Sequence, residues 1–146
     1  MMRVAVPFLV LFIAACGQTQ PPLVASGVDI ARPMPGMKMG AAYFVLTNNT
    51  DEPIRITSVT SPQFAAIEIH ETRIEDGIAR MREIDALVVP PRGTVTLERG
   101  GKHLMLMRPG DLGDVVTLLL MSDDVPVLTI DYAFATDTVS GDNHAG

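Results

Sequence analysis

Two histidines and two methionines are spaced along the chain so that they could hold a metal ion: His70, Met81, His103 and Met105. Imidazole and thioether are neutral donors, and a thioether is soft. Two of each match Cu(I), whereas zinc, calcium and magnesium prefer thiolate, imidazole or oxygen donors. The four residues therefore predict a Cu(I) site that carries only the charge of the ion. Such a site can release copper by stepwise ligand exchange, which suits a carrier better than a store.

The first pair of candidate ligands lies on a predicted β-hairpin. Asp76-Gly77 is typical of a two-residue hairpin turn between two strands. With this turn at the tip, Met81 faces Thr72. In the same register His70 faces Glu83, so His70 and Met81 are diagonal neighbours on one face, about 7–8 Å apart at the backbone.

The second pair is predicted to lie along one strand. His103 and Met105 are two residues apart, so they share a face at a separation of about 6–7 Å, while Leu104 and Leu106 point the other way. His70 is likewise predicted to point outward, away from the hydrophobic core. Two such pairs could close a site of four ligands.

Other methionines could contribute to the site. Met107 shares the predicted face of Met105 and either touches the metal or packs at the edge of the site. Met34, Met37 and Met39 could lend a further ligand or receive copper in transit, and the competing interpretation is a partly exposed turn. Single histidines usually lie at the surface or in hydrogen bonds, and methionines usually fill gaps in a core. The joint spacing, and not the residue types alone, therefore carries the prediction.

Short apolar or alternating stretches, separated by turn residues, predict an all-β domain. The expected strands are 28–31, 41–47, 54–59, 66–73, 79–84, 94–97, 104–107, 115–121 and 125–135. No stretch has a convincing apolar period of 3.6 residues over three turns. About nine short strands with frequent turns predict a two-sheet Greek-key β-sandwich or barrel.

The start of the chain predicts export and a lipid anchor. Residues 1–15 combine a short positive start with an apolar run too short to span a bilayer, which is typical of a secretory signal. Ile13-Ala14-Ala15-Cys16 resembles a bacterial lipoprotein box, in which cleavage before Cys16 is followed by lipid attachment to it. The alternative is a cysteine that is lost on cleavage elsewhere. We expect a flexible spacer at 16–23, a copper-binding β-sandwich at 24–136 and a disordered tail at 137–146.

Composition excludes several classes of site and function. Cys16 is the only cysteine, so the folded part cannot hold a disulfide, a cysteine nucleophile, a zinc-cysteine site or a blue-copper centre. The net charge of −6 and the lack of tryptophan disfavour nucleic acid as a partner. Glu71, Glu75 and Asp76 lack a partnered base, so we expect a solvated hairpin and no enzyme. Membrane contact is expected through the lipid alone.

The spacing resembles that of a known family, the periplasmic copper chaperones called PCuAC. Their pattern is His, ten residues, Met, twenty-one residues, His, one residue, Met, and this chain matches it at every position. Residues 41–44 and 103–107 also look like the family, and the resemblance covers roughly 24–135. It implies a cupredoxin-like sandwich that binds Cu(I) near its surface through the four matching residues. Members often have a longer tail rich in His and Met, whereas this chain has His144 alone, which leaves a second copper site open.

The same resemblance implies that the protein delivers copper in the periplasm, and the lipoprotein box at Cys16 predicts that it does so as a membrane-anchored envelope lipoprotein. The expected recipient is cytochrome c oxidase, through its subunit II or its assembly factors. Two other classes stay open from the residues themselves. A metal-free envelope adhesion or assembly sandwich would explain the acidic composition and the β pattern, but not the spacing. An electron-transfer copper protein would need a thiolate ligand.

Overall fold

The computed structural model describes residues 20–134, which form eleven β-strands and no helix. The strands are β1 (Leu23–Ala31), β2 (Met39–Asn48), β3 (Ile54–Ile56), β4 (Ser58–Thr60), β5 (Phe64–Glu75), β6 (Ile78–Glu83), β7 (Leu87–Val89), β8 (Thr94–Leu97), β9 (Lys102–Pro109), β10 (Val115–Ser122) and β11 (Val125–Ala133). A helix that could cross a membrane is therefore not found in this range. The predicted signal, the lipidation site Cys16, the tail and His144 lie outside the described residues.

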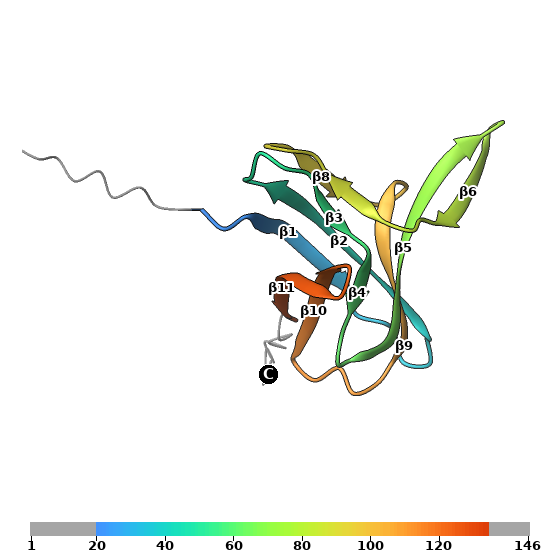
Figure 1. Ribbon diagram of the computed structural model, residues 1–146. Coiled ribbons are helices and arrows are strands. Elements are labelled where there is room, and N and C mark those ends of the chain that lie inside the picture. The colour runs from blue at the N-terminus through green and yellow to red at the C-terminus, as the bar shows by residue number, and fades with distance from the viewer. Residues whose placement is uncertain (1–19, 135–146) are drawn as a thin grey trace, which may run out of the picture.

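The strands pair into three antiparallel sheets (Figure 1). The largest has the order β1-β2-β9-β5-β6, and β8 also pairs with β2. The second has the order β11-β10-β4, and the third consists of β3 and β7. The strands of the largest sheet are not consecutive in sequence, because β9 lies between β2 and β5. The predicted all-β sandwich is confirmed.

Alternate residues of the strands build one buried apolar cluster. In β9, Leu104 and Leu106 are buried, and in β10, Val116, Leu118 and Leu120 are buried as well. These strands belong to different sheets, so the cluster joins the sheets, and burial of apolar surface contributes about 25 cal/mol for each Å². A strand that gives every second residue to the core leaves its other residues on the opposite face. In the largest sheet, that opposite face carries the predicted ligands.

Two strand predictions differ from the structure. The segment 54–59 is not one strand, because the chain leaves the β3–β7 sheet and enters the β10 sheet at Thr57. There the Thr57 N–H donates to the Met121 carbonyl at 2.8 Å, and the Thr57 hydroxyl accepts from the Asp123 N–H at 2.8 Å. The other difference is β7, which was not expected. Its three residues are too short for a recognisable alternation, but Leu87 and Val89 are buried and the strand pairs with β3.

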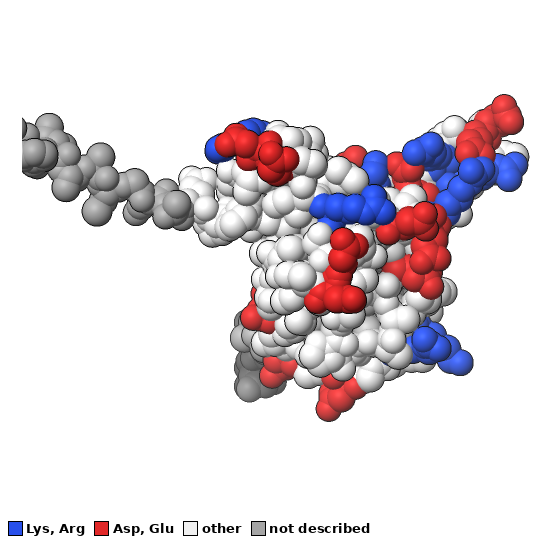
Figure 2. All heavy atoms as spheres, viewed as in Figure 1, with Lys and Arg blue, Asp and Glu red and all other residues white. Residues whose placement is uncertain are grey.

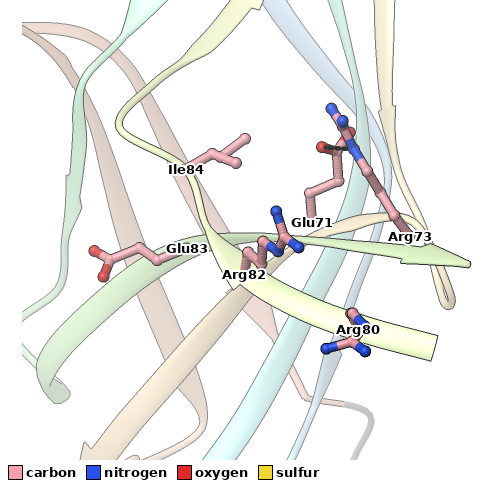
Figure 3. Close-up of a pocket in the computed structure, with 6 residues that line it drawn as sticks. All are labelled: Glu71, Arg73, Arg80, Arg82, Glu83 and Ile84. Carbon is pink, nitrogen blue, oxygen red and sulfur yellow. Dashed lines mark hydrogen bonds and ion pairs between the residues drawn. The ribbon is translucent and has the colours of Figure 1, made fainter. Parts of the chain in front are cut away.

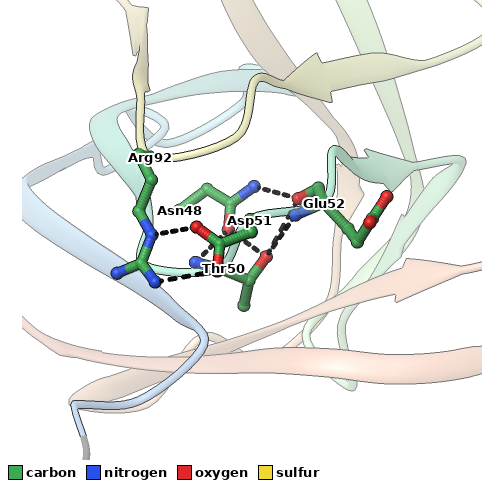
Figure 4. A network of polar contacts seen from close by, with 5 residues as sticks. All are labelled: Asn48, Thr50, Asp51, Glu52 and Arg92. Atoms are coloured by element: carbon green, nitrogen blue, oxygen red, sulfur yellow. Dashed lines mark hydrogen bonds and ion pairs between the residues drawn. The ribbon is translucent and has the colours of Figure 1, made fainter.

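A buried asparagine connects the end of β2 to β7 (Figure 4). The Asn48 side chain is 1% exposed, and its amide donates to the Glu52 carbonyl at 2.7 Å and to the Val89 carbonyl at 3.2 Å. Its oxygen accepts from the Thr50 N–H at 2.9 Å and from the Thr50 hydroxyl at 2.7 Å. All the polar groups of this side chain are therefore satisfied, as burial requires.

The turn after Asn48 is also held by an ion pair. Arg92 Nε lies 2.7 Å from Asp51 Oδ1, and the Arg92 N–H donates to the Thr50 carbonyl at 2.9 Å. The hydrogen bond from Arg92 and its positive charge lower the pKa of Asp51. Both side chains are exposed, so this pair adds little to stability and mainly fixes the local conformation.

Replacement of Asn48 by alanine is expected to lower the free energy of unfolding by about 2–3 kcal/mol, because it leaves buried backbone groups without partners. Urea unfolding followed by circular dichroism measures the change. Asn49→Ala is the matched control, since the Asn49 amide makes one exposed hydrogen bond, to the Pro21 carbonyl. Equal losses in the two variants would contradict the role assigned to the buried network.

Candidate metal centre

The four predicted ligands lie on three neighbouring strands of the largest sheet. β5 lies between β9 and β6. On one side His70 pairs directly with His103, and Glu68 pairs with Met105. On the other side Met81 of β6 is diagonal to His70. Residues opposed in antiparallel strands share a face, so the four candidate ligands lie on one face of the sheet.

The β5–β6 hairpin has the register that the sequence predicts. Asp76 and Gly77 have φ values of 53° and 77°, as the two central residues of a type I′ turn require. Met81 consequently faces Thr72, and His70 faces Glu83. The prediction that His70 and Met81 share a face is confirmed, while their role as ligands stays a prediction.

His103 is held in one orientation by the loop before it. Its Nδ1 lies 3.1 Å from the Gly101 carbonyl oxygen, which also accepts from the Thr72 N–H at 3.0 Å. Because a carbonyl only accepts, Nδ1 carries the proton and Nε2 keeps its lone pair. A metal-binding histidine typically has its second nitrogen fixed in this way. The side chain is more enclosed than a surface ligand, since His103 is 6% exposed.

His70 also has one nitrogen in a hydrogen bond and one nitrogen free. Its Nε2 lies 2.8 Å from the Glu68 carboxylate, which only accepts, so Nε2 carries the proton. Its Nδ1 is buried and has no hydrogen-bond partner among the residues that the structure describes. A buried polar atom without a partner needs an explanation, and a bound metal would supply one. The ring centre of His70 lies 5.9 Å from that of His103.

The sequence did not indicate a role for Glu68, although a signal was present. Glu68 lies two residues before His70, and residues two apart in a strand share a face. It also faces Met105 across the strands, so it lies beside both predicted pairs. The carboxylate orients the His70 ring and raises its strength as a donor, as outer partners of metal ligands do.

An aromatic ring lies beside His103, and a guanidinium group lies over that ring. The Tyr43 ring centre is 6.4 Å from that of His103, and the Arg99 guanidinium lies 5.0 Å from the Tyr43 ring. Arg99 in turn lies 3.5 Å from the Asp29 carboxylate. This packing helps to enclose His103, so one edge of the site is shielded from water.

The methionines differ in exposure. Met81 is 51% exposed on β6, where every residue is exposed, whereas Met105 is half-buried. Met107 pairs directly with Met39, so both lie on the same face as Met105. The site therefore has two enclosed imidazoles, one half-buried thioether and one thioether open to solvent.

The opposite face of the hairpin carries charges. A pocket of about 210 Å³ is lined by four residues of this face, Glu71, Arg73, Arg80 and Arg82 (Figure 3). Ile84 and Glu83 also line it, although Glu83 faces His70 and belongs to the ligand face. Figure 2 shows acidic and basic side chains gathered on this hairpin. The pKa of Glu71 is lowered by hydrogen bonds from Lys102, which has the larger effect, and from Arg73. Its carboxylate is therefore ionised, and both of its oxygens are paired with these two side chains. It is not available as a metal ligand.

Histidine, cysteine and carboxylate side chains do not form a metal site by themselves in the described part of the chain. Within residues 20–134, no group of three or more His, Cys, Asp and Glu side chains could hold a metal ion. The two imidazoles alone give two donors, so thioethers must complete any site on this face. That donor set fits a soft, monovalent ion such as Cu(I).

Solved structures with the same fold include PCuAC domains. The copper-bound PCuAC domain from PmoF2 has a TM-score of 0.62 and 23% identity, and the match covers 77% of this chain and 91% of that domain. The Cu(I) form of DR1885 from Deinococcus radiodurans has a TM-score of 0.62 and 31% identity, and the match covers 85% of each chain.

The sequence comparisons identify the family. Among curated proteins, the uncharacterized protein RP573 of Rickettsia prowazekii is 26% identical over 101 residues, and the match covers 66% of this chain and 56% of that protein. The chain thus spans little more than half of that relative. The family model described as "Putative lipoprotein LpqE-like" matches residues 23–130. The chain therefore belongs to the LpqE-like family, and the relation to PCuAC proteins that its His and Met spacing predicted is confirmed.

Proposed function

We propose that the protein is a copper carrier of the cell envelope that binds one Cu(I) ion through His70, Met81, His103 and Met105. The observation that carries the proposal is the shared face of the largest sheet, where His70 pairs with His103 and each imidazole keeps one nitrogen free. Two imidazoles and two thioethers add no charge to the ion, which suits a cargo that must leave again.

The related structures support copper as the cargo. The PmoF2 domain was solved with copper bound, and the Deinococcus protein was solved in a Cu(I) form. The proposed ligand set is soft enough to favour the same oxidation state here. It also avoids thiols, which would form disulfides in an oxidising compartment.

The geometry suggests an order of ligand exchange. Met81 is the most exposed of the four residues and lies on an edge strand, whereas His103 is held by Gly101 and enclosed by Tyr43. A donor from a recipient protein therefore reaches the ion most easily by replacing the Met81 thioether. The remaining three ligands hold the ion until the recipient supplies further donors. The protein acts in this scheme as a carrier and not as an enzyme.

For the recipient, we propose cytochrome c oxidase, through its subunit II or its assembly factors. What supports this step is the resemblance to periplasmic copper chaperones. A lipid at Cys16 would keep the carrier at the membrane, in the compartment where the recipient exposes its copper sites. Transfer of Cu(I) to apo subunit II, compared with transfer to an assembly factor that carries a thiol pair, identifies the recipient.

Anaerobic titration against a Cu(I) chelator tests the binding itself. We expect one tightly held Cu(I) ion per chain, because the proposed face offers one set of two imidazoles and two thioethers. The control is the double variant His70→Ala/His103→Ala, whose folding is checked by circular dichroism. Equal affinity in the double variant would overturn the proposal.

Removal of the Glu68 carboxylate is expected to weaken Cu(I) binding by about 10-fold, because it fixes the proton on His70 Nε2. The variant is Glu68→Ala, measured by the same chelator competition. Glu83→Ala is the matched control, since Glu83 also faces His70 but makes no hydrogen bond to it in the structure. Equal weakening in both variants would indicate an effect of charge alone.

A further inference from the structure

A row of methionines continues from the proposed site along the same face of the sheet. Met107 follows Met105 on β9, and Met39 of β2 pairs directly with Met107. Opposed residues have Cβ atoms about 4.5–5.5 Å apart, and residues two apart on a strand are separated by about 6–7 Å. The flexible side chains of Met39, Met105 and Met107 can therefore approach one another.

A tight turn places two more thioethers next to this row. The Met37 N–H donates to the Met34 carbonyl at 2.9 Å, across Pro35-Gly36. Proline followed by a glycine with a φ of 84° is typical of a type II turn, which brings its two ends within about 7 Å. The Arg108 N–H donates to the Lys38 carbonyl at 2.8 Å, so β9 holds the residue between Met37 and Met39.

Three of these methionines do not pack in the hydrophobic core. Met34, Met37 and Met39 are 69%, 53% and 54% exposed, and none of them belongs to the buried cluster. Methionine usually fills irregular gaps inside a protein, which these three do not do. Their thioether side chains are therefore accessible from solvent, and a thioether is a donor that favours Cu(I).

We propose that Met37, Met39 and Met107 form a second, weaker Cu(I) site through which the ion enters the main site. The inference rests on the proposed function and adds a route to it. A site of thioethers alone lacks the imidazole donors and is expected to bind Cu(I) less tightly than the main site. Weak binding close to the main site is what a transfer position requires.

The transfer step is an exchange of neutral ligands. An ion held by Met37, Met39 and Met107 first gains the Met105 thioether, which lies beside Met107 on the same strand. It then loses Met39, Met37 and Met107 as His103 and His70 supply nitrogen lone pairs and Met81 supplies the last thioether. Copper stays in the Cu(I) state throughout, and no proton is released, because thioethers carry none and the two imidazoles bind through their free nitrogens.

Methyl NMR of the full chain with ¹³C-labelled methionine tests the second site. During anaerobic titration with Cu(I), the first equivalent is expected to shift the methyl signals of Met81 and Met105. The second equivalent is expected to shift those of Met37, Met39 and Met107. The signal of Met121, which lies on β10 in another sheet, is the internal control and should not move.

A triple variant distinguishes the effect of the sulfur donors from the effect of side-chain volume. Leucine has nearly the volume of methionine without the donor, so Met37→Leu/Met39→Leu/Met107→Leu should keep the fold and the first equivalent. It is expected to lose the second equivalent and to load the main site several-fold more slowly from a Cu(I)–chelator complex. Met121→Leu is the control for the substitution itself.

The outcomes distinguish this inference from the proposed function. Unmoved signals of Met37, Met39 and Met107, or a triple variant that still takes a second equivalent at the same loading rate, would overturn the second site. Unmoved signals of Met81 and Met105 would overturn the main site. Each set of methyl signals reports on its own site, whichever result the other set gives.

Discussion

Replacement of His103 by alanine is expected to weaken Cu(I) binding by more than about 100-fold, beyond the loss that removal of an outer hydrogen-bond partner typically causes. His103 lies at the centre of the proposed site, where it faces His70 across the strands and lies two residues from Met105 on β9. Its ring is already oriented by the Gly101 carbonyl, so little reorganisation accompanies binding. Anaerobic competition with a Cu(I) chelator measures the change.

Two controls make this result specific. His144→Ala removes another histidine of the chain and is expected to leave the affinity unchanged. Since His103 is enclosed, its replacement could also loosen the sheet, and thermal unfolding of the copper-free variant measures that effect separately. Unchanged Cu(I) affinity in a folded His103→Ala variant would show that copper does not bind on this face of the sheet.

Replacement of Leu106 by alanine is expected to lower the free energy of unfolding by about 3–5 kcal/mol, which is a large part of the stability of a domain of this size. Leu106 is fully buried and pairs with Ile67 and with Gly40. Removal of its side chain leaves a cavity inside the cluster that joins the sheets. Urea unfolding measures the loss.

The neighbouring residue supplies the control. Met107 is of similar size but lies on the opposite face of the same strand and is half-buried, so Met107→Ala is expected to cost less than about 1 kcal/mol. The comparison tests the alternation of β9, on which the place of His103 and Met105 depends. If Met107→Ala were the more damaging variant, the faces of β9 would be exchanged and the proposed site would lie in the core.

Local patterns predicted much of the fold. Asp76-Gly77 adopts positive φ values that few other residue pairs tolerate, so the turn and the register of β5 and β6 followed from the sequence. Alternation predicted the buried positions of β9 for the same reason, because a period of two leaves each strand only one way to face the core. The switch between sheets at Thr57 was missed, because it depends on hydrogen bonds to residues more than sixty positions away.

The site was predicted in part. Two separate pairs were predicted from the spacing, whereas the structure pairs His70 directly with His103. That contact depends on β9 lying next to β5, although β6, β7 and β8 come between them in the chain. No local pattern encodes such a long-range pairing. The enclosure of His103 by Tyr43 has the same origin, since Tyr43 comes from β2, on the other side of β9.

The position of β6 at the edge of the sheet has a consequence for the energetics of release. Within residues 20–134, β6 pairs with β5 alone, and the hairpin extends away from the sandwich (Figure 1). Regions with few buried contacts open at a lower free energy than the rest of a domain. The strand that carries Met81 can therefore fray while β5, β9 and the core stay folded. In the proposed ligand set, one bond to the ion can break on its own, so the lifetime of bound copper depends on the hairpin and not on the stability of the whole domain.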